Sequence, residues 1–129
     1  MKLSIVTINY NNLAGLRKTM ESVFSQTCKD FEYIVIDGAS TDGSAEYVRT
    51  QADKLTYWVS EPDTGIYNAM NKGVRAATGE YVLMLNSADS LVDEYVIARI
   101  MPELDGTDIV QGNTSDGGKR QRGYGKSDI

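Results

Sequence analysis

The sequence predicts an α/β fold: a Rossmann-like, mostly parallel sheet with helices on both faces. One observation behind this class is that four short apolar runs, rich in β-branched residues, lack clean polar alternation, as strands covered on both faces do. The other is that segments with apolar residues at helical spacing separate these runs. Strands that alternate with helices imply βαβ crossovers and a parallel sheet.

The predicted elements follow one another along most of the chain. Strands are expected at residues 3–8, 31–36, 55–59, 81–85 and 108–111. After the first strand, apolar residues at i, i+4, i+7 and i+8 predict a helix: Leu16, Met20, Val23 and Phe24. The most regular helix follows the third strand, with one face made of Ile66, Ala69, Met70, Gly73, Val74 and Ala77. Gly79 marks its end, and a further helix is expected across residues 92–104.

Length and composition predict one globular domain. At 129 residues and 41% hydrophobic content, the chain can bury one sizeable core. This domain is expected to span residues 1–112. In residues 113–129 glycines are mixed with Lys and Arg and no apolar period survives, which predicts a loose, basic tail.

Composition also excludes several classes of protein. A single cysteine, Cys28, cannot form an internal disulfide, and no Cys/His cluster offers zinc ligands, so a reducing compartment and the cytoplasm are expected. No signal peptide and no run near the ~20 apolar residues that span a bilayer is present, so the chain is expected to be soluble, with peripheral membrane association left open. The net charge of -5 argues against a nucleic-acid binder.

The segments that follow the four strands are the expected ligand site, because ligands of such folds lie outside the carboxyl ends of the strands. These segments are residues 9–12, 37–44, 60–65 and 86–89, and each is rich in polar side chains. An acidic protein that binds an anionic diphosphate needs a divalent cation or a cluster of donors to hold it. Carboxylates at strand ends are therefore candidates.

Two of these segments carry such carboxylates. Asp37 ends the second strand, where it can accept a hydrogen bond from a base or a ribose, whereas Asp42 or Thr41 is better explained as the cap of the next helix. Asp89 lies in a short polar loop that can supply an oxygen ligand for Mg²⁺ or Mn²⁺, or it can cap the following helix, as Ser90 can.

The predicted helix after the third strand has a polar face that is either solvated or turned toward the site: Asn68, Asn71, Lys72 and Arg75. Gly65 lies near its start, where a glycine permits close backbone approach to an anionic ligand. Periodicity alone does not choose between these two interpretations.

Five sequence stretches together resemble a known family. They are SIVTINYNN at 4–12, IDGASTDGS at 36–44, EPDTGIYNAMNKG at 61–73, ATGEY at 77–81 and LNSAD at 85–89. In order and spacing they resemble the signatures of family 2 glycosyltransferases of the GT-A fold, across about the first 110 residues. The resemblance implies that residues 1–112 are the N-terminal, nucleotide-sugar-binding part of such an enzyme.

The resemblance also implies roles for single residues. Thr7 and Tyr10 match positions that line the base pocket, and Asp37 matches the carboxylate that contacts the base. Asp63 lies in the family's loop beside the nucleotide. The place of the Asp-x-Asp motif is taken by Asn86, Ser87 and Asp89, of which Asp89 matches the metal ligand.

Three positions depart from the family pattern. Gly38 stands where many relatives carry a second acidic residue, Ala88 stands where they carry Asp or Gly, and Asn68 stands where many place Asp. The acceptor-side carboxylate of the family lies well downstream of the Asp-x-Asp region, so the general base is expected beyond Ile129.

The activity that the resemblance implies is transfer of a sugar from a nucleotide diphosphate sugar to a hydroxyl of a glycan or lipid-linked acceptor, in polysaccharide or glycan synthesis. Inversion at the anomeric carbon and a divalent cation are expected. One alternative is a truncated module that binds the nucleotide sugar without turnover. A nucleotidyltransferase is the weaker alternative, because residues 7–12 contain no Gly-rich, Lys- or Arg-bearing phosphate loop.

Overall fold

The structure, a computed structural model, describes residues 3–103 together with residues 120 and 121. These residues form one sheet in the order β3-β2-β1-β4-β5, and every neighbouring pair of strands is parallel. The strands are β1 (Leu3–Asn9), β2 (Phe31–Asp37), β3 (Tyr57–Ser60), β4 (Tyr81–Met84) and β5 (Arg120–Gln121). The predicted α/β class with a parallel sheet is confirmed.

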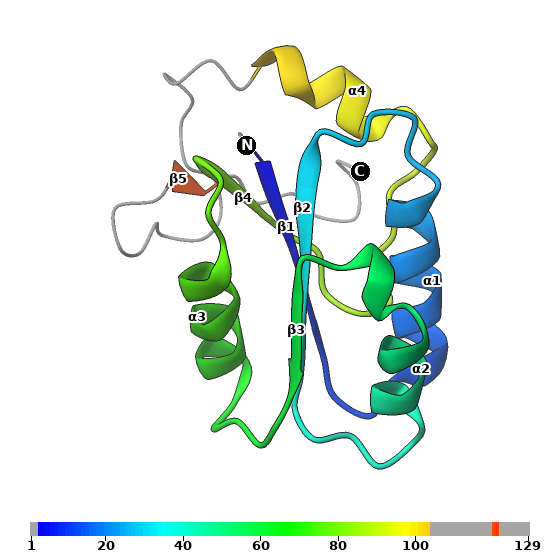
Figure 1. Cartoon of the computed structure of the whole chain (residues 1–129), viewed down its shortest axis with the longest axis vertical. Helices are drawn as coiled ribbons and strands as arrows, with labels where there is room; N and C mark the ends of the chain where they lie inside the picture. The colour runs from blue at the N-terminus through cyan, green and yellow to red at the C-terminus, as the bar shows by residue number, and fades with distance from the viewer. Residues whose placement is uncertain (1–2, 104–119, 122–129) are drawn as a thin grey trace.

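Helices cover both faces of the sheet (Figure 1). One face carries α1 (Leu13–Phe24) and α2 (Ser44–Thr50), with the short 3-10 helix η1 (Ala52–Lys54) after α2, and the other carries α3 (Ile66–Ala76). α4 (Val96–Ile100) continues into a second 3-10 helix, η2 (Met101–Glu103), and its apolar side chains join the core beneath α1. No helix among the described residues is long and apolar enough to cross a membrane.

The two faces of the sheet build two separate cores. Along β1 the side chains alternate, so that Ile5 packs in the core with α1 whereas Val6 and Ile8 pack against α3. β2 does the same, with Val35 on the α1 side and Ile36 on the α3 side. Burial on both faces explains why neither strand shows polar alternation in the sequence.

The strand order creates the crevice that holds the site. The chain runs outward from β1 to β2 and β3, and then α3 returns it to the other side of β1, where β4 pairs with β1. At such a reversal the loops leaving neighbouring strands diverge to opposite faces and leave a crevice at the carboxyl ends. In this chain that crevice lies between the ends of β1 and β4.

Several predicted boundaries differ from the observed ones. The third strand begins at Tyr57 rather than at residue 55, because the N–H of Leu55 donates to the carbonyl of Ala52 at the end of η1. The helix expected across residues 92–104 is reduced to α4 and η2. The strand expected at residues 108–111 lies outside the described residues. β5 is a strand at two residues where the sequence predicts none.

Candidate functional site

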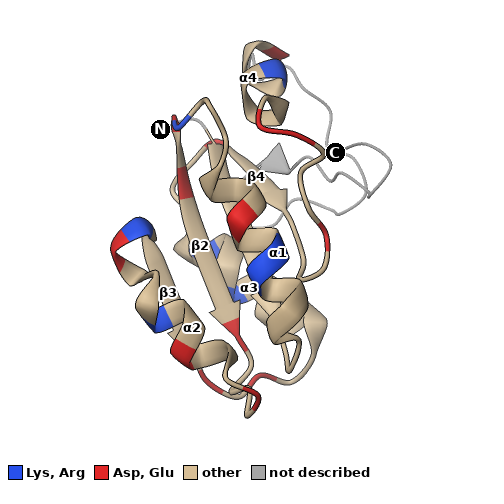
Figure 2. Ribbon diagram, turned by 90° about the vertical axis from the view of Figure 1, so that its right-hand side faces the viewer, with Lys and Arg blue, Asp and Glu red and all other residues tan. Residues whose placement is uncertain are grey.

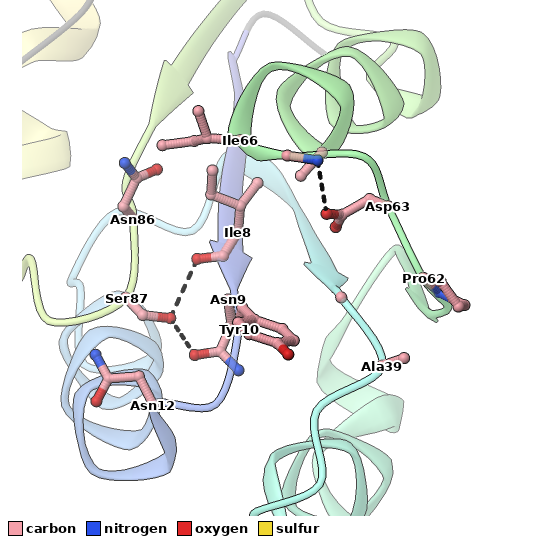
Figure 3. Close-up of a pocket in the computed structure, with 13 residues that line it drawn as sticks. Ile8, Asn9, Tyr10, Asn12, Ala39, Pro62, Asp63, Ile66, Asn86 and Ser87 are labelled. Atoms are coloured by element: carbon pink, nitrogen blue, oxygen red, sulfur yellow. Dashed lines mark hydrogen bonds between the residues drawn. The ribbon is translucent and has the colours of Figure 1, made fainter.

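A cleft of about 710 Å³ opens at the carboxyl ends of the strands. Its walls come from the ends of all four strands and the start of one helix (Figure 3). They are formed by the last two residues of β1 with Tyr10 and Asn12, by residues 38–39 after β2, by residues of the β3–α3 loop and the first turn of α3, and by residues 86–87 after β4. The volume lies within the usual range of about 300–1,000 Å³ for small-molecule sites. The ligand region predicted from the strand ends is therefore one continuous cleft.

Four of the residues to which the sequence assigns a contact with the substrate line this cleft: Tyr10, Asp63, Asn86 and Ser87. The side chain of Tyr10 is 67% exposed, so its ring is accessible to a ligand. Asn68 stands beside the cleft, where its Oδ1 accepts a hydrogen bond from the N–H of Thr64 at 3.2 Å. The structure thus brings together residues that are up to about 77 positions apart in the sequence.

Asp37 and Thr7 lie beneath the surface. Asp37 is fully buried, and its carboxylate accepts hydrogen bonds from Asn9 Nδ2 at 2.8 Å, Ser60 Oγ at 2.7 Å, and both the N–H and the hydroxyl of Ser40. Thr7 is fully buried on the α1 side of the sheet, where its hydroxyl pairs with that of Tyr33 at 2.7 Å. Burial raises the pKa of Tyr33, although the bond from Thr7 lowers it in part.

Gly38 brings two cleft residues together. A Cβ at this position would lie 2.9 Å from Oδ2 of Asp63 and 3.3 Å from the Tyr10 ring. The space that a side chain at position 38 would occupy is therefore taken by the Asp63 carboxylate. Asp63 Oδ1 accepts from the N–H of Gly65 at 3.3 Å, which orients this carboxylate at the wall of the cleft.

Strained backbone surrounds the cleft. Among the residues that the structure describes, three non-glycine residues have positive φ: Asn11 at 47°, Ala39 at 60° and Ala88 at 81°. They follow β1, β2 and β4, respectively. An alanine in this region costs on the order of 1–3 kcal/mol, and such residues cluster at ligand sites where the surroundings hold them in place. Their occurrence in three separate loops around one cleft supports a binding function for it.

Comparison with known proteins identifies the family. Residues 4–129 match the family model described as Glycosyl transferase family 2. The chain belongs to glycosyltransferase family 2. The resemblance found in the sequence is thereby confirmed.

Several related sequences come from mycobacteria. An uncharacterized glycosyltransferase of Mycobacterium tuberculosis is 40% identical over 105 residues, which are 81% of this chain and 40% of that protein. A PGL/p-HBAD biosynthesis glycosyltransferase of the same organism is 35% identical over 116 residues, covering 85% of this chain and 45% of that protein. The chain therefore spans less than half the length of these relatives.

Solved glycosyltransferases share the fold of this family 2 chain. A mannosyltransferase from Pyrobaculum calidifontis, in complex with GDP-Man and Mn²⁺, superposes with a TM-score of 0.75 at 25% identity, over 84% of this chain and 34% of that one. S. aureus TarS in complex with UDP-GlcNAc superposes with a TM-score of 0.73 at 22% identity, over 90% and 37%. Both are GT-A glycosyltransferases, and the predicted GT-A nucleotide-binding half is confirmed as the fold.

The loop after β4 is the one to which the sequence resemblance assigns the Asp-x-Asp position. Ser87 donates its hydroxyl to Asn9 Oδ1 at 2.6 Å and lies 3.1 Å from the carbonyl of Ile8. The carbonyl of Asp89 accepts from the Thr19 hydroxyl, and Asp89 itself is half-buried outside the cleft lining. Oδ1 of Asn86 is a buried oxygen with no hydrogen-bond partner among the described residues.

Asp42 joins the first turns of two helices. Ser44 is the first residue of α2, and both its hydroxyl, at 2.6 Å, and its N–H donate to Oδ1 of Asp42. Leu13 is the first residue of α1, and its N–H donates to Oδ2 of Asp42. The hydrogen bond from Ser44 is the main cause that lowers the pKa of Asp42. The N-cap of α2 is Gly43, so Asp42 does not occupy the predicted N-cap position, but its carboxylate still satisfies the first N–H group of each helix.

Asn9 and Asn12 lie in the segment 9–12 that the strand-end rule predicts as part of the ligand site, although the resemblance assigns a role to neither of them. Asn9 is the last residue of β1 and is buried, and Asn12 accepts at Oδ1 from the N–H of Gly15 in the first turn of α1. Both line the cleft. The strand-end rule therefore includes Asn9, but the sequence does not show that its side chain is bonded to Asp37.

Proposed function

We propose that the cleft binds a nucleotide diphosphate sugar and that the chain supplies the donor-binding part of a glycosyltransferase. The observation that carries the proposal is the convergence of four strand-end loops on one cleft at the reversal of strand order. Family membership supports it, as does the likeness to a mannosyltransferase solved with GDP-Man and Mn²⁺. The proposed reaction moves the sugar, with inversion, to a hydroxyl of a glycan or lipid-linked acceptor.

The nucleoside is proposed to lie between Tyr10 and Asp63. The exposed ring of Tyr10 offers an apolar face for a base, and the Asp63 carboxylate beside it can accept hydrogen bonds from ribose hydroxyls. Asn68 borders this end of the cleft. Thr7 and Asp37 remain proposed members of the base end, but because both are buried, a direct contact from either requires the residues above it to move.

A divalent cation, Mg²⁺ or Mn²⁺, is proposed at the β4 end of the cleft, held by the carboxylate of Asp89 and by Oδ1 of Asn86. A buried amide oxygen without a partner and a nearby carboxylate fit a hard cation, which takes oxygen ligands and keeps waters and substrate phosphates for its other positions. When bound, the cation neutralises the charge that develops on the departing diphosphate. Ser87 is proposed to contact the diphosphate sugar from the same loop.

No general base is assigned among the described residues. Asp93 does not line the cleft. Its carboxylate forms a surface ion pair with Arg99, with 3.2 Å between the carboxylate oxygen and the guanidinium nitrogen. Asp63 is the single acidic residue among the described residues that line the cleft, and it belongs to the nucleoside end. We propose that the acceptor-side carboxylate is supplied by sequence beyond Ile129 and that the reaction takes place in the cytoplasm, in polysaccharide or glycan synthesis.

Calorimetric titration of UDP, CDP, GDP and ADP, each with Mn²⁺ and again with a chelator, tests the donor site. We expect a pyrimidine diphosphate to bind better than ADP, and binding to weaken when the metal is removed. Gly38→Val should weaken binding because its side chain displaces the Asp63 carboxylate at the wall of the cleft, whereas Ala98→Val on the exposed side of α4 should leave binding unchanged. If no nucleoside diphosphate binds with metal present, the donor-site assignment is wrong.

A further inference from the structure

A continuous hydrogen-bonded network crosses the floor of the cleft. At one end, in the loop after β4, the Ser87 hydroxyl donates to Asn9 Oδ1 at 2.6 Å. Asn9, at the end of β1, then donates from Nδ2 to Asp37 Oδ1 at 2.8 Å. At the other end, Ser60 of β3 donates to Asp37 Oδ2 at 2.7 Å. Four neighbouring strands are thus tied together at their carboxyl ends.

Asn9 is the central residue of this network, and its amide orientation follows from its partners. The Asp37 carboxylate is an acceptor only, so it requires the NH₂ group of Asn9. The amide oxygen is then left for the Ser87 hydroxyl, which donates to it. Asn9 is 6% exposed and Asp37 is fully buried, so water does not compete for these bonds. No other standard side chain of this size both donates and accepts with a fixed geometry at one strand end.

Each end of the network leads to a different part of the proposed donor site. Ser87 follows Asn86, the residue with the unpaired buried oxygen, in the loop that we assign to the diphosphate and the cation. Asp37 precedes Gly38, against which Asp63 and Tyr10 pack at the nucleoside end. A shift of either loop must stretch or break its hydrogen bonds to this network. Such a shift is unfavourable unless the bonds re-form, because buried polar groups are costly when they are only partly satisfied.

We propose that Asn9 is a positioning residue that couples the two walls of the cleft, so that a ligand seated against the β2–β3 loops also orders the loop after β4. This inference rests on the proposed function for the identity of the ligand. The coupling itself belongs to the free protein and is measurable without any ligand. If Asn9 only filled space, a structural change at Ser87 would have no effect at Ser60.

The first test uses amide chemical shifts in the full chain. β3 and β4 are three strand intervals apart, roughly 14 Å, so Ser87→Ala should not reach Ser60 directly. We expect Ser87→Ala to shift the amide resonances of Ser40 and Ser60 in the parent chain and to leave them unmoved in an Asn9→Leu background. Ser25→Ala, at the exposed end of α1, is the matched control and should move neither resonance.

The second test is a double-mutant cycle on affinity for UDP or GDP with Mn²⁺, which remains decisive if Asn9→Leu does not fold. Ser60→Ala and Ser87→Ala should each weaken binding about threefold to tenfold. Substitutions this far apart with no shared partner multiply their effects to within about twofold. Through Asn9 they do share a partner, so the double variant should bind about threefold or more better than the product of the single effects predicts.

The possible outcomes separate the two proposals. Unmoved Ser40 and Ser60 resonances in Ser87→Ala, together with multiplicative effects on nucleotide affinity, would overturn the coupling while leaving the donor site intact. A parent chain that binds neither nucleotide would overturn the proposed function, and the chemical shifts would then decide on the coupling alone. Transmission that persists in Asn9→Leu would show that another path carries it and would also refute the role of Asn9.

Discussion

Asp89 and Asp93 lie four positions apart after β4 but in different surroundings. Asp89 is half-buried beside the loop that lines the cleft, whereas Asp93 is exposed and pairs with Arg99. We expect Asp89→Asn to weaken Mn²⁺-dependent binding of a nucleoside diphosphate by at least about tenfold, because a neutral amide is a poorer ligand for a hard cation. Asp93→Asn should change it less than about twofold. Titration calorimetry measures both, and equal losses would exclude the metal role of Asp89.

Tyr10 offers a second test at the level of one residue. Its ring lines the cleft and is largely exposed, so a base can stack on it. Loss of such stacking costs about 1–3 kcal/mol, so Tyr10→Ala should weaken nucleotide binding about fivefold to a hundredfold. Tyr10→Phe should bind nearly as well as the parent. Tyr67→Ala removes an even more exposed ring that does not line the cleft, and a similar loss in that variant would contradict the assignment.

Sequence patterns predict which residues stand at strand ends but not which of them meet. Tyr10, Asp63, Asn86 and Ser87 were predicted from that rule and do line one cleft. The burial of Asp37 could not be predicted, because its partners Asn9 and Ser60 are 28 and 23 positions away and their pairing depends on strand register. The contact roles of the remaining candidates stay predictions.

Glu32 connects three elements at the opposite, amino-terminal edge of the sheet. From β2 it accepts hydrogen bonds from Ser4 of β1 and from the N–H and hydroxyl of Thr78, which precedes β4. Burial raises the pKa of Glu32, but these bonds, with a further one from the N–H of Gly79, together hold it below its ordinary value. Glu32 therefore stabilises the fold in its ionised form.

The lowered pKa of Glu32 in the folded protein determines how stability depends on pH. A carboxyl whose folded pKa is below its unfolded value contributes fully above the unfolded value, near 4.5, and loses the contribution as pH falls through the folded pKa. Glu32→Gln should lower the free energy of unfolding by about 1–3 kcal/mol at neutral pH, because its NH₂ group faces N–H donors. Urea titrations from pH 7 to pH 3 should show this difference shrinking in acid. Glu80→Gln, exposed beside β4, is the control, and a pH-independent difference for Glu32→Gln would refute the prediction.

The contact between α3 and β1 depends on Gly73. A Cβ at this position would lie 2.3 Å from Cγ1 of Val6. Alanine is the better helix former by about 0.5–1 kcal/mol, but overpacking of a core costs about 1–3 kcal/mol, so the clash should prevail. We expect Gly73→Ala to be destabilising in urea titrations. The added substitution Val6→Ala should recover about 1 kcal/mol relative to the sum of the single effects, and strict additivity would show that the two residues do not collide.

Helix boundaries show where periodicity stops being informative. The apolar spacing in residues 92–104 predicts one long helix, but α4 begins only at Val96. The carbonyls of Asp93 and Glu94 accept from Gln26 and Thr27, which follow α1. Because these acceptors are engaged by a distant segment, the first turn cannot form. The apolar spacing within residues 92–104 does not show that donors from a distant segment bind these carbonyls.

Within residues 3–103, basic and acidic residues are interspersed along the chain. Figure 2 shows basic residues on α1, α2 and α4 with acidic residues between them, in a chain whose net charge is -5. The cleft lining among the described residues contains one acidic side chain and no Lys or Arg. An anionic diphosphate therefore meets no cationic side chain among the described residues that line the cleft. A bound cation is the simplest means to compensate its charge.

The same lining predicts how the 129-residue chain behaves on its own. Its described residues include groups suited to the nucleoside and the diphosphate but no second carboxylate opposite them to take a proton from an acceptor hydroxyl. A missing general base forfeits about 100- to 10,000-fold in rate, and an acceptor that is not oriented forfeits more. An open cleft also admits water to the sugar. We therefore expect this chain to bind donor and at most to hydrolyse it slowly.

Incubation with UDP-GlcNAc or GDP-Man and oligosaccharide or membrane-derived acceptors, followed by product analysis, measures both hydrolysis and transfer. The full-length mycobacterial relative is assayed alongside. Rapid transfer by the 129-residue chain alone would mean that the acceptor site lies within it.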